Sequence, residues 1–205
     1  MLTWLFRPQC AACTAPCEAP LCDACKSSLA ELGPACPRCA LPTGEAGLTC
    51  RRCIREPLAL DLVVAPWRFG GELASAIRRL KFTGATHIAR SIAPLWAPLL
   101  AAAARDAVVV PVPLHWRRRL RRGFDHTWLL ARHACAAAGI APPEPLLRRI
   151  RHAPPQSTLP AAARRANVRG AFEARGAVPS QIVLVDDVVT TGSTLSAAAT
   201  ALREA

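Results

Sequence analysis

The chain has 205 residues, of which 52% are hydrophobic, so it is long enough for one α/β domain and a small second module. It contains no run of about 18 uninterrupted apolar residues, and its N-terminus lacks the basic start and cleavage site of a secretion signal, so we expect no membrane insertion and a cytoplasmic location. The formal net charge of +12 favours an anionic partner, such as a nucleic acid or a phosphorylated small molecule.

The first feature along the chain is a cluster of cysteines. Nine of the ten lie within residues 10–53, and eight of these form the Cys-x-x-Cys pairs Cys10/Cys13, Cys22/Cys25, Cys36/Cys39 and Cys50/Cys53. Two such pairs complete one tetrahedral zinc site, so four pairs predict two structural Zn²⁺ ions. We favour sequential pairing, in which the first two pairs bind one ion. A cross-braced arrangement, in which the first and third pairs share an ion, is the alternative. Cys17 breaks the pattern and is taken as a bystander.

Other uses of these cysteines fit the sequence less well. A disulfide framework requires an oxidising compartment, and the chain has no secretion signal. A redox-active Cys-x-x-Cys motif typically occurs once, beside a βαβ unit, whereas this chain has four such motifs in a row. A segment of about 45 residues cannot bury enough apolar surface to fold alone, whereas zinc supplies on the order of 10 kcal/mol of folding free energy. Ligation by cysteine alone leaves no open position on the metal, so we expect a surface-presenting module without zinc catalysis.

The rest of the chain predicts an α/β domain. We expect a boundary near Pro57, with a double zinc ribbon at residues 1–56 and a doubly wound parallel-sheet domain at residues 57–205. Hydrophobic patterns predict, in chain order, a strand-like run at 62–69, helices at 72–82 and 88–104, a buried strand at 107–113, a helix at 125–138, a short strand at 146–150, a loop at 152–165, a buried strand at 181–187 and a helix at 194–203. In such a domain the ligand lies at the carboxyl ends of the strands.

The segment VLVDDVVTTGSTL, residues 183–195, carries a candidate phosphate site. Gly192 allows backbone torsions closed to other residues, so successive N–H groups can converge on an anion at the start of a helix. Hydroxyl donors are added by Thr190, Thr191, Ser193 and Thr194. Asp186 and Asp187 suit ribose hydroxyls, or a magnesium ion with its waters. The pattern predicts a site for a ribose 5-phosphate, and it contains neither a Walker A lysine nor a GxGxxG motif.

Positive charge is concentrated just before this segment. Residues 115–175 contain 13 arginines and only the acidic residues Asp125, Glu144 and Glu173. A biased genome composition can explain a preference for arginine over lysine, but it does not explain an excess of positive charge. We therefore expect this region to bind phosphate groups.

These motifs together resemble a known family. The acidic pair and hydroxyl-rich loop resemble the signature of type I phosphoribosyltransferases, and with the cysteine pairs the chain is similar to the ComF family of bacterial competence-associated proteins. The resemblance extends to LKFTG at residues 80–84, VPVPLHWRRRLRRGFDHTWLLA at residues 110–131 and RRIRHAPPQSTLPAAARRANVRGAF at residues 148–172. In the family a further strand follows the last helix, so the resemblance implies that this chain lacks its last strand.

The family resemblance implies several ligands and partners. It implies binding of phosphoribosyl pyrophosphate with Mg²⁺, with Arg117, Arg118 and Arg119 near the pyrophosphate and the loop at 156–167 closing over it. The family's Asn-Gln stands here as Asp125-His126, and neither residue is assigned a site role. Whether the domain catalyses phosphoribosyl transfer, and to which acceptor, stays open.

DNA uptake is the process in which the family implies a role. Single-stranded DNA and a DNA-uptake motor protein are the further partners implied. The alternative is a DNA-binding or adaptor protein of the uptake machinery, with a catalytically idle fold.

Overall fold

A computed structural model describes residues 8–151 and 170–205. Its N-terminal part consists of two similar halves. The first half has an antiparallel bridge between Gln9 and Pro16 and ends in helix α1 (Asp23–Ser27), and the second has a bridge between Ala35 and Pro42 and ends in helix α2 (Arg51–Arg55). In each half one cysteine caps the short helix and the next cysteine of the pair lies inside it. This repeat matches two successive zinc knuckles.

The second part is built on two parallel strands. Strand β1 (Val108–Pro111) pairs with β4 (Ile182–Val185), with Val108 opposite Ile182. A separate antiparallel pair joins β2 (Leu147–Arg149) to β3 (Phe172–Ala174). The parallel pair confirms the two buried strands expected from unbroken apolar runs.

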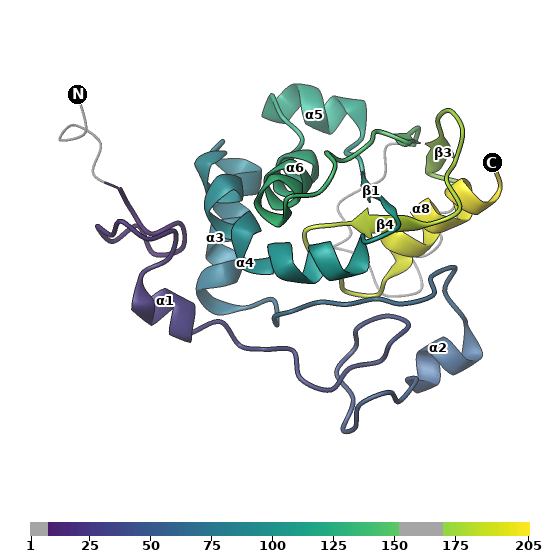
Figure 1. The fold of residues 1–205 in the computed structure, drawn as a ribbon, viewed down its shortest axis with the longest axis horizontal. Helices are drawn as coiled ribbons and strands as arrows, with labels where there is room; N and C mark the ends of the chain where they lie inside the picture. The colour runs from purple at the N-terminus through teal and green to yellow at the C-terminus, as the bar shows by residue number, and fades with distance from the viewer. Residues whose placement is uncertain (1–7, 152–169) are drawn as a thin grey trace.

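Helices cover both faces of the parallel pair (Figure 1). On one face lie α4 (His87–Ala103), which is helical despite Pro94 and Pro98, and α6 (His126–Ala138). The core on this face contains Ala93, Leu100, Val109, Ala131, Ala134, Cys135 and Val185. The other face is covered by α8 (Ser193–Arg203), and its core contains Val110, Val112, Leu195, Ala198 and Leu202. Adjacent residues of β1 thus enter opposite cores, as expected for a strand buried on both faces.

Helix α3 (Gly71–Phe82) joins this domain to the zinc ribbon. Its buried residues Ala76, Ile77 and Leu80 share a core with Cys10 and Cys25 of the ribbon. In Figure 1 the ribbon runs along the lower side of the domain, from α1 beside α3 to α2 below α8. The ribbon therefore contacts the domain through both of its halves, the first at α3 and the second at the start of α8.

The expectation of a strand-like run at residues 62–69 is wrong. The segment forms only one isolated bridge, between Trp67 and Glu31, and irregular hydrogen bonds from Val63 N to Pro37 O (2.7 Å) and from Arg68 N to Ala30 O (2.8 Å). Prolines in this segment and in its ribbon partner remove the N–H groups that a regular ladder requires.

The arginine-rich segment after β1 forms a helix that the hydrophobic patterns did not predict. Helix α5 (Trp116–Arg122) begins at His115, whose Nδ1 accepts a hydrogen bond from Arg117 N (3.3 Å), and ends at Gly123 with φ +80°. Asp125 then caps α6, because its Oδ1 accepts from the backbone of Thr127 and Trp128. The loop expected at 152–165 lies outside the described residues.

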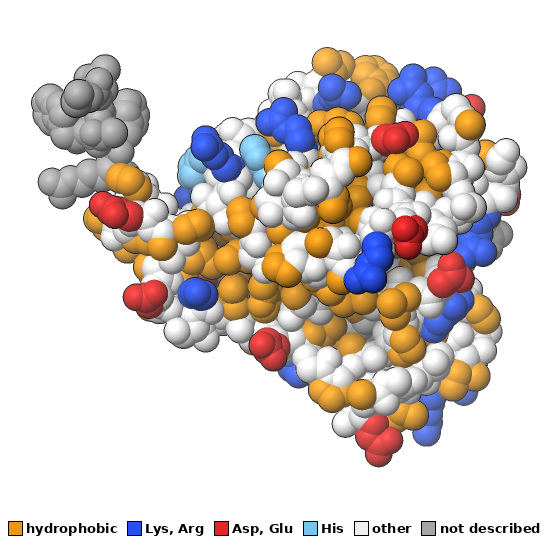
Figure 2. Space-filling view, in the orientation of Figure 1, with side chains coloured by type: hydrophobic (Ala, Val, Ile, Leu, Met, Phe, Trp, Pro, Cys, Tyr) orange, Lys and Arg blue, Asp and Glu red, His pale blue; other side chains and the backbone are white. Residues whose placement is uncertain are grey.

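The outer edge of β4 lines an apolar cavity. Among the described strands β4 pairs only with β1, and the cavity, of about 1170 Å³, is also lined by α4, α8 and residues 59–69. Figure 2 shows hydrophobic side chains across the middle of this face. None of the helices in the described ranges is long and apolar enough to cross a membrane.

Candidate functional site

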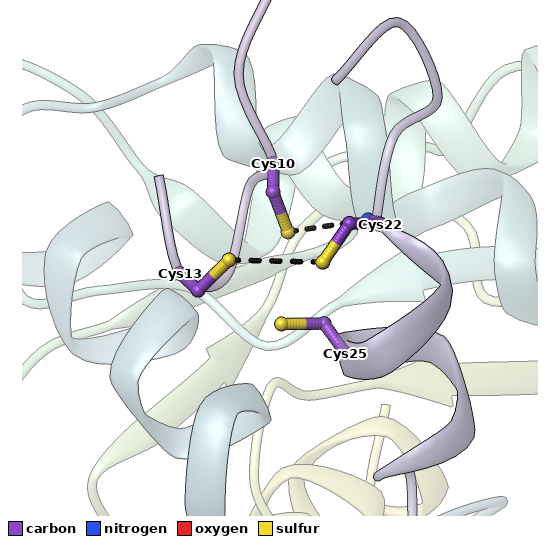
Figure 3. Close-up of side chains that lie close together, drawn as sticks. All are labelled: Cys10, Cys13, Cys22 and Cys25. Atoms are coloured by element: carbon purple, nitrogen blue, oxygen red, sulfur yellow. Dashed lines mark hydrogen bonds between the residues drawn. The ribbon is translucent and has the colours of Figure 1, made fainter. Parts of the chain in front are cut away.

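The first four cysteines of the pairs converge on one point (Figure 3). The Sγ atoms of Cys10, Cys13, Cys22 and Cys25 all lie within 4.8 Å of one another, and those of Cys13 and Cys22 are 3.7 Å apart. Sulfurs around a tetrahedral zinc with bonds of about 2.3 Å are about 3.8 Å apart, so this spacing fits zinc. The backbone N–H of Cys22 also donates to Cys10 Sγ (3.4 Å), which favours a thiolate there.

The second cluster repeats this geometry. It contains Cys36, Cys39, Cys50 and Cys53, with Cys39 Sγ 3.7 Å from Cys50 Sγ and the N–H of Cys50 donating to Cys36 Sγ (3.3 Å). The grouping is the sequential one, and the cross-braced alternative is excluded. Cys17 belongs to neither cluster, and its Sγ donates to Ala19 O (2.9 Å).

The thiols of each cluster cannot all ionise without a cation. Burial alone would raise the pKa of Cys36, but N–H groups of Cys50 and Arg38 lower it to about 7. Burial and neighbouring thiols raise the pKa of Cys53 to about 12. In the first cluster, N–H donors overcome burial and lower the pKa of Cys10 to about 6. A zinc ion would supply the charge that lets four adjacent thiolates coexist.

The hydroxyl-rich loop at residues 190–194 lies between β4 and α8. Gly192 has φ +70° and caps α8, while Thr191 and Ser193 are buried with their hydroxyl oxygens 2.8 Å apart. A small hollow is lined by Asp186 and residues 188–195. One residue of the predicted acidic pair and the predicted phosphate loop therefore line the same space.

The two predicted carboxylates have different surroundings. Asp187 is 7% exposed and contacts Lys81 Nζ and, at 3.3 Å, His126 Nε2. Burial alone would raise the pKa of Asp187, but the hydrogen bond from His126 and the charge of Lys81 lower it below its ordinary value. Asp186 accepts from Asp187 N (2.9 Å), and burial together with the charge of Asp187 raises the pKa of Asp186 well above its ordinary value. Asp187 is thus an ionised, paired group, and Asp186 is the one that lines the hollow.

His126 connects Asp187 to α5. Its Nδ1 lies 3.2 Å from Arg122 Nη1, and because a guanidinium only donates, we assign the ring proton to Nε2, which faces Asp187. A glutamine amide offers the same combination of donor and acceptor, which explains how an imidazole can occupy the position where the ComF family has glutamine. Sequence patterns assigned no role to His126, and the family-like LKFTG block was the only signal for Lys81.

Three arginines gather beside the acidic pair: Arg118, Arg122 and Arg149. Burial lowers the pKa of Arg149, the charge of Arg118 lowers it further, and Asp186 opposes this. Burial and Arg118 likewise lower the pKa of Arg122. The Nε atoms of Arg122 and Arg149 are buried and have no hydrogen-bond partner among the described residues. This cluster has the unused donors and positive charge that an anion requires.

The structure separates the three arginines predicted to meet pyrophosphate. Arg118 is partly buried and acts on Arg122, four residues later on the same face of α5. Arg117 and Arg119 are exposed, and the Arg117 guanidinium lies 5.2 Å from the centre of the Trp116 ring. Their spacing could not be interpreted without knowing that the segment is helical.

Comparisons with known proteins bear on both parts of the chain. A family model of the double zinc ribbon domain matches residues 1–54. Competence protein F of Haemophilus influenzae is 34% identical over 146 residues, which are 64% of this chain and 62% of that protein. The DNA utilization protein YhgH is 36% identical over 133 residues in Salmonella typhi (60% of this chain, 58% of that protein) and 31% over 145 residues in Escherichia coli strain K12 (64% of each).

The chain spans less than two thirds of the length of these relatives. No solved structure matches it. The fold and the two four-cysteine clusters define a protein with a double zinc ribbon and a small parallel-sheet α/β domain. More particularly, the chain is a homologue of competence protein F and the YhgH proteins, which confirms the resemblance to the ComF family. The domain boundary between residues 56 and 57 stays a prediction.

Cys36→Ser is expected to lower the zinc content from two ions per chain to one, because the second site loses one of its four thiolates. Elemental analysis of the purified protein by mass spectrometry measures the metal. Cys17→Ser is the matched control and should keep both ions. Two ions in Cys36→Ser, or one in Cys17→Ser, would contradict the ligand assignment.

Replacing the two aspartates should affect the free energy of unfolding differently. Asp187→Asn should cost roughly 3 kcal/mol at pH 7, because it leaves Lys81 beside a neutral group. The folded pKa of Asp187 is lowered, so its contribution is present above the unfolded pKa of about 3.9 and is lost as pH falls towards the folded value. The folded pKa of Asp186 is raised, so its ionisation opposes folding as pH rises above about 3.9. Asp186→Asn should therefore be neutral or stabilising at pH 7. Urea unfolding tests this, and equal losses in both variants would refute it.

Proposed function

We propose that this protein binds phosphoribosyl pyrophosphate with Mg²⁺ through a ComF-like phosphoribosyltransferase domain and serves in competence and DNA uptake. The observation that carries the proposal is the hollow at the carboxyl end of β4, which Asp186 and residues 188–195 line together. The printed names of the relatives, competence protein F and DNA utilization protein, support the role in DNA uptake. The ten cysteines, all within the described residues, form no disulfide bonds, which suits a reducing, cytoplasmic compartment.

Each part of the ligand has a chemical counterpart in this region. The 5-phosphate would accept hydrogen bonds from the loop at residues 190–194, and Asp186 would accept them from ribose hydroxyls. The pyrophosphate and its Mg²⁺ would lie towards Arg118, Arg122 and Arg149, whose cluster holds unused donors. Arg117 and Arg119, on the outer side of α5, would lie at the rim.

Transfer chemistry would use the same groups. As the bond between ribose C1 and the pyrophosphate oxygen breaks, negative charge builds on the leaving group, and the arginine cluster would stabilise it. A nitrogen nucleophile would then form the new bond at C1. No acceptor site is assigned, so binding is the part of the function that we propose.

Wild-type protein is expected to bind phosphoribosyl pyrophosphate in the presence of Mg²⁺, and Asp186→Asn to bind at least about tenfold more weakly, because a charge-assisted hydrogen bond is lost. Isothermal titration calorimetry of the zinc-loaded protein measures both affinities. The Asp186→Asn/Asp187→Asn double variant serves as the non-binding control. Asp106→Asn, at an exposed aspartate, is the matched control. Absence of binding by the wild type would refute the proposed site.

A second candidate function, binding of single-stranded DNA, is supported by the outer surface of α5. Trp116 is 56% exposed, Leu120 is 73% exposed, and Arg117 lies over the Trp116 ring. Nearby, Phe82 is 68% exposed and has the Arg122 guanidinium 5.0 Å from its ring centre. Exposed rings interleaved with arginines are the features on which unpaired bases stack while the backbone is neutralised.

Fluorescence anisotropy of a labelled oligothymidine over a range of salt concentrations tests this surface. Replacing Arg117 and Arg119 with alanine should weaken binding and flatten the slope of log affinity against log salt by about 1.4, or about 0.7 per phosphate contact. Trp116→Ala should weaken binding without changing the slope. Arg55→Ala, on the ribbon, is the control. Unchanged affinity in all variants would exclude this surface, and an adaptor that docks on a DNA-uptake motor would then be favoured.

A further inference from the structure

The second zinc cluster touches the candidate phosphate loop directly. Arg52 lies between Cys50 and Cys53 in the knuckle, and its Nη2 donates a 2.8 Å hydrogen bond to the backbone carbonyl of Thr191. This contact joins residues 139 positions apart in the chain. Arg52 is partly buried, whereas its neighbour Arg51 is exposed. The two cysteines around it hold the backbone of Arg52, so the knuckle sets the point from which its side chain reaches Thr191.

This hydrogen bond fixes one peptide group of the loop. In a planar trans peptide the carbonyl and the following N–H point in opposite directions. With the Thr191 carbonyl directed at Arg52, the N–H of Gly192 is directed away from the ribbon. The small hollow is lined by residues of the loop and Asp186 and not by Arg52. The loop therefore turns a donor, not an acceptor, to the side where an anion would lie.

Glycine alone does not determine this orientation. Gly192 has φ +70°, and glycine adopts positive and negative φ with similar ease, so rotating the peptide between Thr191 and Gly192 is not prevented by sterics at residue 192. Neighbouring side chains leave no room for a side chain at residue 192, because a Cβ there would lie 2.7 Å from Leu58 Cδ1 and 3.8 Å from Cys39 Cβ. Glycine is thus required, and the choice between its two backbone states is left to Arg52.

We propose that Arg52 is a positioning residue for anion binding, through which the zinc site of Cys36, Cys39, Cys50 and Cys53 holds the phosphate loop with the Gly192 N–H available to the ligand. This rests on the proposed function, because it deepens the role of the same loop. The ribbon is then part of the ligand site, although none of its side chains needs to touch the ligand.

The test compares Arg52→Ala with Arg51→Ala in zinc-loaded protein, using ribose 5-phosphate and pyrophosphate as separate probes in calorimetry. Arg52→Ala should weaken ribose 5-phosphate binding by about tenfold or more and change pyrophosphate binding much less, because the arginine cluster is intact. Arg51→Ala should match the wild type, Arg52→Lys should recover part of the affinity, and all variants should keep two zinc ions. Equal weakening of both probes would indicate a general structural defect and overturn the proposal.

A measurement on the protein without ligand distinguishes failure of the proposed function from failure of the role proposed for Arg52. The ¹³C resonance of the Thr191 carbonyl should move upfield in Arg52→Ala and stay in place in Arg51→Ala, because a hydrogen bond to that oxygen is lost only in the former. A resonance that does not move overturns the inference about Arg52, whatever binds. If the resonance moves and the wild type binds neither probe, the proposed function fails, and the anchoring of the loop has no role in ligand binding.

Discussion

Four thiolates held around one cation form the interaction on which this structure depends. The ribbon has little core of its own: in each half the buried residues are mainly the cysteines and the small residues beside them, such as Ala11 and Ala12. Burial and neighbouring thiols oppose full ionisation of each cluster, so we expect the ribbon to gain much of its stability from a metal that supplies the compensating charge. Helix α3 and the candidate phosphate loop both contact the ribbon, so the coordination of the cysteines also bears on the position of these two parts of the domain.

Each knuckle holds a different side of the candidate site. In the first, Arg79 of α3 donates to the carbonyls of Ala11 (3.3 Å) and Ala12 (2.9 Å), and two residues later Lys81 contacts Asp187. In the second, Arg52 donates to Thr191. Both contacts run from a guanidinium to a backbone carbonyl, which fixes geometry while leaving the ligand-facing groups unoccupied. The two cysteine clusters thus lie next to different parts of the candidate site, the first near the helix that carries Lys81 and the second near the loop at Thr191.

Much of this could be predicted because it is local in the sequence. The cysteine spacing, the apolar strands and the order of strand, acidic pair, glycine loop and helix each depend on neighbouring residues. Arg149, Arg122 and His126 could not be found in the same way, because they reach the site through packing of α5, α6 and β2, whose relative placement has no local signal. The segment at 62–69 shows the converse, since its strand-like composition was overruled by prolines in its partner.

The two carboxyl groups of the site differ in how easily they ionise: the pKa of Asp187, which contacts Lys81 and His126, is lowered, whereas burial and the charge of Asp187 raise the pKa of Asp186, which lines the hollow. Asp187 makes ion-pair contacts with Lys81 and His126, and His126 in turn contacts Arg122, so Asp187 has charged partners without a ligand. Asp186 is also removed from solvent, but neither Lys81 nor His126 forms an ion pair with it. Ionising Asp186 therefore stays unfavourable until a cation or a hydrogen-bond donor binds beside it. A ribose hydroxyl or a magnesium ion would supply that partner. The contacts of Asp187 with Lys81 and His126 help to shape the candidate site, and in the proposed function Asp186 would favour a ligand that carries hydrogen-bond donors beside its phosphate.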